Sequence, residues 1–179
     1  MIDLTAARQG PFVAASPLVR PMPPAARWIV RGDAAVMAAA ARALELPFEP
    51  AVCRAAAADG RAVLWLGPDE RLLLAPRDEA GRALADALAG LAHSLVEVSH
   101  RQCALEITGP YAETVLNSGC PLDLEASAFP VGMCTRTVFA KAQIVLWRTA
   151  QHSFHLEVWR SFCAYVSQLL ALAGRELVR

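Results

Sequence analysis

The four histidines and five cysteines are the residues whose side chains could bind a metal or act as nucleophiles. His152 and His155 are three residues apart, which is a ligand spacing on a helix. They lie where a turn enters a predicted strand, however, and positions three apart on a strand point to opposite faces. His100 lies near Cys103, which could pair a thiol with its base. Because Cys103 alternates with Leu105 on a predicted strand, we favour a buried structural cysteine and predict neither a metal site nor a catalytic residue.

The spacing of the cysteines and glycines excludes several common sites. The cysteines form no CxxC pair, which predicts free thiols in a reducing cytoplasm and no disulfide framework or zinc site. The ten glycines form no GxGxxG, GxxxxGK[ST] or GxSxG motif, so the common nucleotide-binding loops and the serine-hydrolase elbow are absent. The cysteines are Cys53, Cys103, Cys120, Cys134 and Cys163.

A few charged residues remain as weaker candidates. Asp123 follows a predicted helix, where an aspartate usually caps a turn. Three arginines lie on or at the ends of the late predicted strands and could meet a carboxylate ligand. Pairing with Glu106, Glu157 or a partner chain is the simpler expectation for them. These arginines are Arg136, Arg148 and Arg160.

The composition describes a globular chain without a bias toward nucleic acid or membrane. Hydrophobic residues make up 55% of the 179 residues, enough to bury a core, and 17 basic residues balance 17 acidic ones. A zero net charge argues against a dedicated nucleic-acid binder, because phosphate contacts require a surplus of cations. The longest uncharged run, 161–174, is shorter than the roughly 20 residues of a membrane span. The N-terminus lacks the pattern of a secretory signal.

Hydrophobic periodicity predicts the same order of elements twice. Asp33 can cap the first helix, Pro47 ends it, and the last helix has a stripe at 3.6-residue spacing. In the first half we expect a strand at 28–30, a helix at 34–46, strands at about 49–57, 61–66 and 71–75, a helix that opens at Asp78 and Glu79, and a strand at 94–99. In the second half we expect a strand at 103–108, a helix at 110–117, strands at about 133–140, 142–148 and 153–159, and a final helix from the cap Ser161 to Gly174.

The repeated order predicts a duplicated α+β fold. Residues 28–32 match 105–109 at a shift of 77, and residues 63–65 resemble 145–147 at a shift of 82. The shared order β-α-β-β-β-α suggests a duplicated ferredoxin-like unit, each with helices on one face of a small sheet. We place the first α+β half at 26–100 and the second at 101–179.

The first 25 residues are predicted to form an extended arm. They hold five of the twelve prolines, and proline resists both helix and central strand. The arm is either disordered or laid across a partner, and the folded part is expected to begin near Arg27.

The predicted core comes from the helix stripes and the strand-like runs. Leu84, Leu88 and Leu91 form the stripe of the second helix. The tryptophans in strand-like runs are read as sheet packing. They are Trp65, Trp147 and Trp159. In the two long helices we expect burial of Leu84, Leu88, Phe162, Val166, Leu169 and Leu170.

Several motifs resemble, in order and spacing, the gamma subunit family of heterotetrameric sarcosine oxidase. The resemblance covers about 27–172 and is specific in the second half. The motifs are VEVS at 96–99, LEITGP at 105–110, LNSGCPLDL at 116–124, GMCTRT at 132–137 and VWRSF at 158–162, with LWLGPDE at 64–70 and LLLAP at 72–76 in the first half. That family is similar to the folate-binding domain of glycine-cleavage aminomethyltransferases, so the resemblance implies that fold.

The resemblance also implies a function. The family's complex oxidatively demethylates sarcosine to glycine, passes the one-carbon unit to tetrahydrofolate and reduces oxygen to peroxide. FAD, FMN, NAD and tetrahydrofolate are held by the large alpha and beta subunits, and zinc by the small delta subunit. The implied role of this chain is a structural, non-catalytic gamma subunit that holds no cofactor and docks chiefly on alpha.

Folate binding by this chain itself is the alternative. Asp123 falls where the aminomethyltransferases carry an acidic residue beside the folate, which makes it the one candidate for a folate pocket. The paired acidic residues that those enzymes carry further on are replaced by Lys141-Ala142-Gln143. A stand-alone folate-binding or aminomethyltransferase-like protein therefore stays open as the second function.

Overall fold

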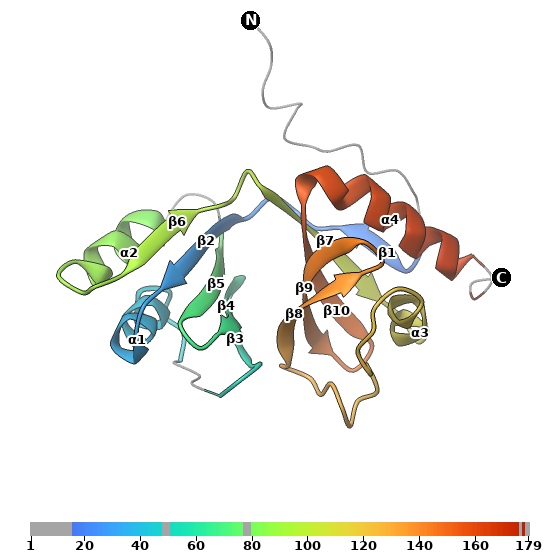
Figure 1. Cartoon of the computed structure of the whole chain (residues 1–179), viewed down its shortest axis with the longest axis horizontal. Coiled ribbons are helices and arrows are strands. Elements are labelled where there is room, and N and C mark those ends of the chain that lie inside the picture. Colours follow the sequence, from blue (N-terminus) through green and yellow to red (C-terminus); the bar gives the residue numbers. More distant parts are fainter. Residues whose placement is uncertain (1–15, 48–50, 77–79, 176, 178–179) are drawn as a thin grey trace, which may run out of the picture. The chain divides into compact units, whose positions relative to one another are not determined.

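A computed structural model describes residues 16–47, 51–76, 80–175 and 177 of the chain (Figure 1). The described residues divide into two compact units. The first unit contains residues 24–99 and 132–135, and the second unit contains the rest. Within the described residues, no helix is both long and apolar enough to cross a membrane.

The first unit is an antiparallel five-stranded sheet with two helices. The strand order is β3-β4-β5-β2-β6. In Figure 1 both helices lie on the same face of this sheet. The strands are β2 (Ala26–Arg31), β3 (Ala55–Ala58), β4 (Arg61–Gly67), β5 (Glu70–Ala75) and β6 (Ser94–Glu97), and the helices are α1 (Ala34–Ala43) and α2 (Ala80–Leu88).

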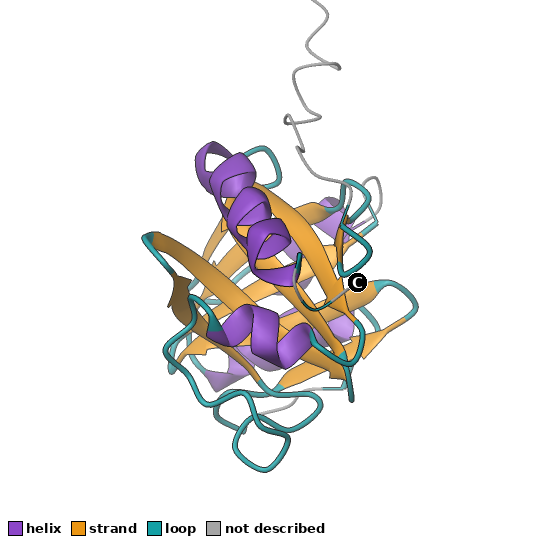
Figure 2. Ribbon diagram, turned by 90° about the vertical axis from the view of Figure 1, so that its right-hand side faces the viewer, coloured by secondary structure: helices purple, strands orange, loops and turns teal. Residues whose placement is uncertain are grey.

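The second unit repeats this arrangement. Its strand order is β8-β9-β10-β7-β1. Its long helix α4 lies across the strands, as Figure 2 shows. The strands of its sheet are β1 (Val19–Pro21), β7 (Gln102–Thr108), β8 (Cys134–Phe139), β9 (Ala142–Ala150) and β10 (Ser153–Trp159), and the helices are α3 (Ala112–Asn117) and α4 (Arg160–Gly174). The first two residues of β8 are grouped with the first unit.

The element order β-α-β-β-β-α is confirmed in both halves. The fold is α+β with two antiparallel five-stranded sheets, and the two sheets obtain their fifth strand differently. In the first unit β6 follows α2 along the chain and pairs with β2. In the second unit the equivalent place beside β7 is taken by β1, from the beginning of the chain.

Strand β1 lies within the segment that the sequence predicts to be an arm. Residues 1–15 of that segment are outside the described residues. Val19 pairs with Ile107, and the amide of Thr108 donates to the carbonyl of Leu18 at 2.9 Å. Leu18 and Val19 are buried. The folded part therefore begins before Arg27, and Pro21 is tolerated because β1 is an edge strand.

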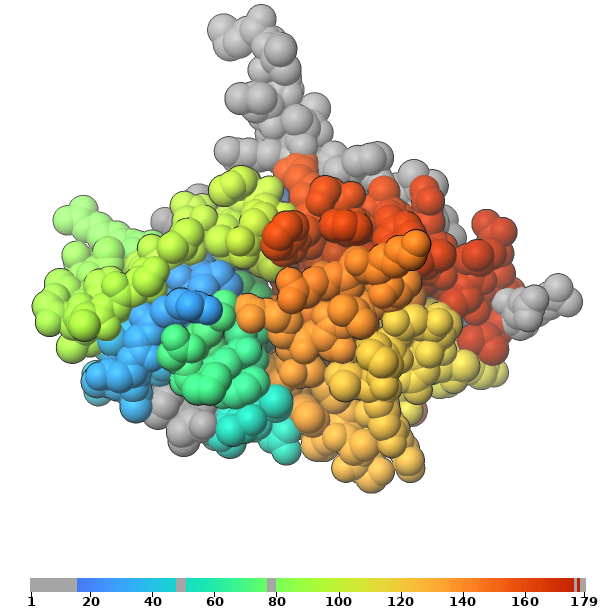
Figure 3. Space-filling model, in the orientation of Figure 1, coloured from blue at the N-terminus to red at the C-terminus, as the bar shows by residue number. Residues whose placement is uncertain are grey.

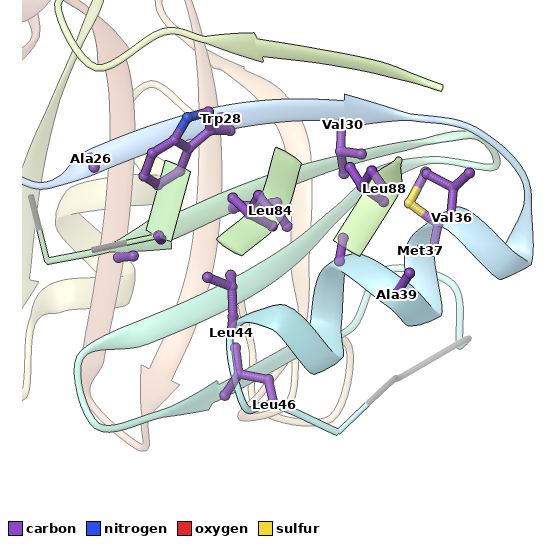
Figure 4. Close-up of a cluster of buried hydrophobic side chains, with 14 residues drawn as sticks. Ala26, Trp28, Val30, Val36, Met37, Ala39, Leu44, Leu46, Leu84 and Leu88 are labelled. Carbon is purple, nitrogen blue, oxygen red and sulfur yellow. The ribbon is translucent and has the colours of Figure 1, made fainter. Parts of the chain in front are cut away.

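Local signals position the helices and turns of the first unit. Asp33 caps α1 as predicted, because its Oδ1 accepts a hydrogen bond from the amide of Val36 at 3.0 Å. Asp59 and Gly60 both have positive φ, which suits the two-residue turn between β3 and β4. The helices then close over β2 and β5 in a buried cluster around Trp28 (Figure 4).

Several predicted boundaries differ from the structure; α1, for example, ends at Ala43 and not near 46. Strand β3 begins at Ala55 and not near 49, since Cys53 has a φ of 57° that interrupts extended backbone. Helix α4 begins at Arg160, so Ser161 is not its cap. The carbonyl of Arg101 accepts from the amide of Arg160 at 2.8 Å, which satisfies a donor that a cap would serve. Asp78 and Glu79, predicted to open α2, lie outside the described residues.

The predicted core is confirmed in part. Leu84, Leu88, Val166 and Leu170 each have no exposed surface. Leu169 is only half-buried, whereas Phe162 is 39% and Leu91 37% exposed. The prediction was wrong for Phe162 because α4 carries apolar residues on more than the face that meets the sheet.

The strand registers correct the predicted overlay of the two halves by one residue. Trp28 lies opposite Leu73, and Leu105 lies opposite Leu156. If Trp28 matches Leu105 at the shift of 77, Leu73 matches Leu156 at a shift of 83 (156 − 73). Val63, opposite Leu73, then matches Leu146, so the predicted shift of 82 is one residue short. A slip of one residue exchanges the two faces of a strand.

Candidate functional site

Arg148 is the centre of a buried polar cluster in the second unit. Its side chain has no exposed surface. Its Nη1 donates to the carbonyls of Leu124 at 2.9 Å and Phe129 at 3.0 Å. Its Nη2 donates to the carboxylate of Glu113 and to the carbonyl of Gln151. One guanidinium therefore holds α3, the loop that follows α3, and the turn between β9 and β10.

The local sequence explains how Arg148 reaches these partners. It alternates with Leu146 along β9 and lies opposite Phe154 of β10, with the guanidinium carbon 5.0 Å from the centre of that ring. The ring covers one face of the cation, which stabilises a buried arginine. Its Nε is buried and has no hydrogen-bond partner within the described part of the chain. Because Nη1 and Nη2 are both bonded within the unit, the cluster fixes the loop that follows α3.

The first unit contains an equivalent pair with the roles exchanged. The shift of 83 matches Trp65 with Arg148 and Arg71 with Phe154. Trp65 and Arg71 lie opposite each other on β4 and β5, with the guanidinium carbon 5.8 Å from the ring centre. Arg71 donates to the carbonyls of Gly67 at 2.6 Å and Glu70 at 3.0 Å. In both units an arginine stacked on an aromatic ring secures the neighbouring hairpin turn.

Asp123 lies in the loop that Arg148 holds. Its side chain is exposed, and its Oδ1 accepts a hydrogen bond from the amide of Glu125 at 2.9 Å. This bond to the residue two positions on forms a local turn. Lys141 and Gln143 are exposed on either side of the buried Ala142, where the chain passes from β8 into β9.

His155 and Glu157 form the second buried polar pair. The Nε2 atom of His155 is 2.8 Å from Oε1 of Glu157, and the carboxylate has no exposed surface. The two residues are two apart on β10 and therefore share a face. The ring centroids of Trp147 and His155 are 5.7 Å apart.

The other histidines are separate from this pair. His93, His100 and His152 are exposed. Nδ1 of His93 is 2.9 Å from the carbonyl of Leu91. Among the residues that the structure describes, no three histidine, cysteine or acidic side chains are arranged to hold a metal ion.

All five cysteines are free thiols, and two have clearly raised pKa values. Burial raises the pKa of Cys134 to about 12. A hydrogen bond with the thiol of Cys103, together with burial, raises the pKa of Cys163. Cys103 itself is half-buried on β7. A raised pKa keeps a thiol protonated, whereas nucleophilic cysteines need a lowered one.

Of the three late arginines, Arg148 pairs with Glu113 and not with Glu106 or Glu157, so the expectation was wrong for this residue. Glu106 instead pairs with Arg20 at 3.1 Å. Arg136 is exposed. Nη2 of Arg160 is buried and has no hydrogen-bond partner in the described ranges.

Trp65 and Trp147 are half-buried on their sheets, in line with the prediction. Trp159 is 44% exposed at the end of β10, where Arg101 lies 5.5 Å from its ring centre. Both arginine–aromatic clusters escaped the sequence prediction, because their partners are contributed by different elements. The sequence feature that could have revealed such a cluster is an isolated arginine inside an apolar strand-like run, as at Arg148.

A model described as the sarcosine oxidase, gamma subunit family matches residues 31–176 of the chain. The sarcosine oxidase subunit gamma of an Arthrobacter species is 42% identical over 104 residues, which cover 57% of this chain and 51% of that protein. The corresponding protein of Corynebacterium sp. strain P-1 is 38% identical over 123 residues, which cover 68% and 61%. The chain thus spans about half to three-fifths of these curated relatives.

Two solved structures resemble the fold. A chain of the heterotetrameric sarcosine oxidase from Corynebacterium sp. U-96, in complex with pyrrole 2-carboxylate, is similar with a TM-score of 0.84 and 31% identity, over 98% of this chain and 93% of that one. The glycine cleavage system aminomethyltransferase T from Bartonella henselae has a TM-score of 0.62 and 14% identity, over 90% of this chain and 49% of that one. The second likeness concerns the fold alone.

Proposed function

The chain belongs to the sarcosine oxidase gamma subunit family, and from this premise we propose that it is the gamma subunit of a heterotetrameric sarcosine oxidase, with a structural role in assembly. The observation that carries the proposal is the similarity to a chain of such an enzyme over almost the whole length of both chains. The proposed assembly converts sarcosine to glycine by oxidative demethylation and transfers the one-carbon unit to tetrahydrofolate.

In this proposal the chemistry belongs to the other subunits. FAD, FMN, NAD, tetrahydrofolate and zinc are assigned to alpha, beta and delta, and the gamma chain docks chiefly on alpha. The uses of the polar side chains support a non-catalytic role. Arg148 and Arg71 bond to backbone carbonyls, and the buried Glu157 pairs with His155. The five free cysteines support a reducing compartment, and we assign the protein to the cytoplasm.

Co-expression with the other subunits tests the proposal directly. A tagged gamma chain should recover alpha, beta and delta in a single complex that releases peroxide when sarcosine is added. The gamma chain purified alone should have no flavin absorbance and release no peroxide. A wild-type chain that recovers none of the three subunits contradicts the assignment, and a yellow isolated chain contradicts the non-catalytic role.

Folate binding by the isolated chain is the alternative that the aminomethyltransferase-like, duplicated ferredoxin-like fold suggests. Asp123 remains the residue to test, and its exposed position and its bond to the amide of Glu125 favour a turn-forming role. Calorimetry with tetrahydrofolate should detect no binding to the isolated chain. Saturable binding that Asp123→Asn weakens, with Glu125→Gln as the matched control, favours the alternative.

A further inference from the structure

The exposed side of helix α4 carries a row of large apolar residues. Phe162 is 39%, Tyr165 36% and Leu172 56% exposed, and Leu169 between them is half-buried. These four positions are spaced by three and four residues, so they lie on one side of the helix. The rings of Phe162 and Tyr165 lie edge to face, with their centroids 6.4 Å apart. We call Phe162, Tyr165, Leu169 and Leu172 the α4 stripe; Figure 3 shows α4, in red, on the surface of its unit.

The α4 stripe is additional to the face that packs on the sheet. That face already contains Cys163, Val166 and Leu170, all buried. Helix α2, in contrast, exposes Arg82 and Asp86, which are an ion pair of the kind that a solvent-facing helix carries. From 161 to 174 the sequence of α4 contains no charged residue. A helix that is apolar on nearly all sides is normally covered on all sides.

The charges beside the α4 stripe are positive. Arg160 begins the helix, and Arg101 stacks on Trp159, which is itself exposed next to the stripe. No acidic residue lies within the bounds of α4. Tryptophan, tyrosine, phenylalanine and arginine are the residues enriched in protein interfaces. The patch therefore suits a protein surface that offers apolar side chains beside carboxylates.

From these observations we infer that the α4 stripe, with Trp159 and Arg101 at its edge, is the surface through which this chain docks on another subunit of its assembly. The inference rests on the proposed function. The occupant is a protein surface that combines apolar side chains with aspartate or glutamate. A second copy of this chain fits less well, because its α4 brings no carboxylate to Arg101.

The test uses the full-length chain co-expressed with the other subunits. Phe162→Glu together with Tyr165→Glu places two carboxylates on the stripe without touching the buried face. Val96→Glu is the matched control, since Val96 is 51% exposed on β6 of the other unit. Circular dichroism and thermal unfolding establish that each variant is folded. Affinity for the other subunits should fall at least tenfold for the double variant and stay within twofold for the control.

A single charge change tests the proposed complementarity. Arg101→Glu should weaken binding by about tenfold, whereas Arg101→Lys should retain most of the affinity, and added salt should weaken the wild-type complex. If wild type assembles and the folded double variant assembles with equal affinity, the surface is wrong but the subunit assignment stands. A wild-type chain that recovers no other subunit contradicts the subunit assignment itself.

Two further outcomes would overturn the choice of partner. The first is a dimer of the isolated wild-type chain in sedimentation experiments that Phe162→Glu and Tyr165→Glu dissolve, which identifies a second copy as the occupant. The second is binding to vesicles of anionic phospholipid that the same substitutions abolish, because an aromatic helix with basic neighbours also suits a membrane surface.

Discussion

At the scale of single residues, both units contain an arginine stacked on an aromatic ring, with the two residue types exchanged between the strands. Arg148 stacks on Phe154 in the second unit, and Arg71 stacks on Trp65 at the matching positions of the first. In each case the guanidinium bonds to carbonyls of a nearby turn or loop. An arginine bonded in this way holds its own turn or loop in place.

Removing the guanidinium of Arg148 should destabilise the second unit strongly. Arg148→Met keeps an apolar side chain of similar length but leaves the carbonyls of Leu124 and Phe129 and the carboxylate of Glu113 without their donor. We expect a loss of about 3 kcal/mol or more in the free energy of unfolding. Urea unfolding measures it, with Arg82→Met as control, because the exposed Arg82–Asp86 pair is worth little. Equal stability of both variants would contradict the proposed role.

The buried thiol of Cys134 should make stability depend on pH in the alkaline range. Its pKa is about 12 in the folded chain and 9.0 for an ordinary thiol. Below pH 9 both states keep the proton. Between pH 9 and 12 the unfolded state loses it while the folded state retains it. The free energy of unfolding therefore falls as pH rises, by about 1 kcal/mol per pH unit.

Comparison with Cys134→Ala isolates this contribution. Urea unfolding at pH 8, 9, 10 and 11 should give a shallower fall for the variant than for wild type. Each protein's free energy of unfolding at pH 8 is its reference. For the variant, this reference already includes the cost of the small cavity that the substitution leaves. Parallel pH profiles for the two proteins would show that the thiol does not titrate as described.

At the scale of elements, the sequence predicted most helices and strands because their signals are local. Asp33 caps α1, and alternation marks β4, whose buried and half-buried residues alternate along its length. The N-cap of α4 is Trp159 and not Ser161, a difference of two residues, because Arg101, from a distant element, accepts the hydrogen bond of the first helical amide. Phe162 and Leu169 of the α4 stripe were predicted to be buried, since periodicity reveals an apolar face but not what covers it.

Two neighbouring leucines of α4 should respond differently to truncation. Leu170 is fully buried, so Leu170→Ala should cost about 2–5 kcal/mol in the free energy of unfolding. Leu169 is half-buried on the α4 stripe, and Leu169→Ala should cost clearly less in the isolated chain. Chemical unfolding of both variants measures the difference. Equal losses would mean that the stripe packs against the unit as tightly as the buried face does.

At the scale of the whole molecule, the predicted order of elements is right, but the origin of the fifth strands was not predictable. Strand β1 has three residues and a proline, so no pattern identifies it. Its pairing with β7 joins segments more than 80 residues apart, as in Val19 opposite Ile107. The one-residue error in the overlay has a similar cause, because Val63-Leu64-Trp65 and Val145-Leu146-Trp147 look alike while their cross-strand partners set the faces.

The pairing of β1 makes the folding of the second unit dependent on the beginning of the chain. Leu18 and Val19 are buried, and Leu18 lies against Gly109 and Gly174 so closely that a Cβ at Gly109 would come within 2.9 Å of it. Deleting residues 1–23 removes these two side chains and the strand. Burial of each is worth about 1.5–3 kcal/mol. At about 2–4 °C per kcal/mol for a chain of this size, the melting temperature should fall by roughly 10 °C.

Comparison with a chain that lacks only residues 1–15 isolates the contribution of 16–23, because the two truncated chains differ in that segment alone. Calorimetry should show the loss in the shorter chain relative to the longer one. Hydrogen exchange should show faster exchange along β7, which loses its edge partner, than along β2, which keeps β6 beside it. If the two truncated chains melt together and β7 stays as protected as β2, then β1 is a surface contact that the second sheet does not require.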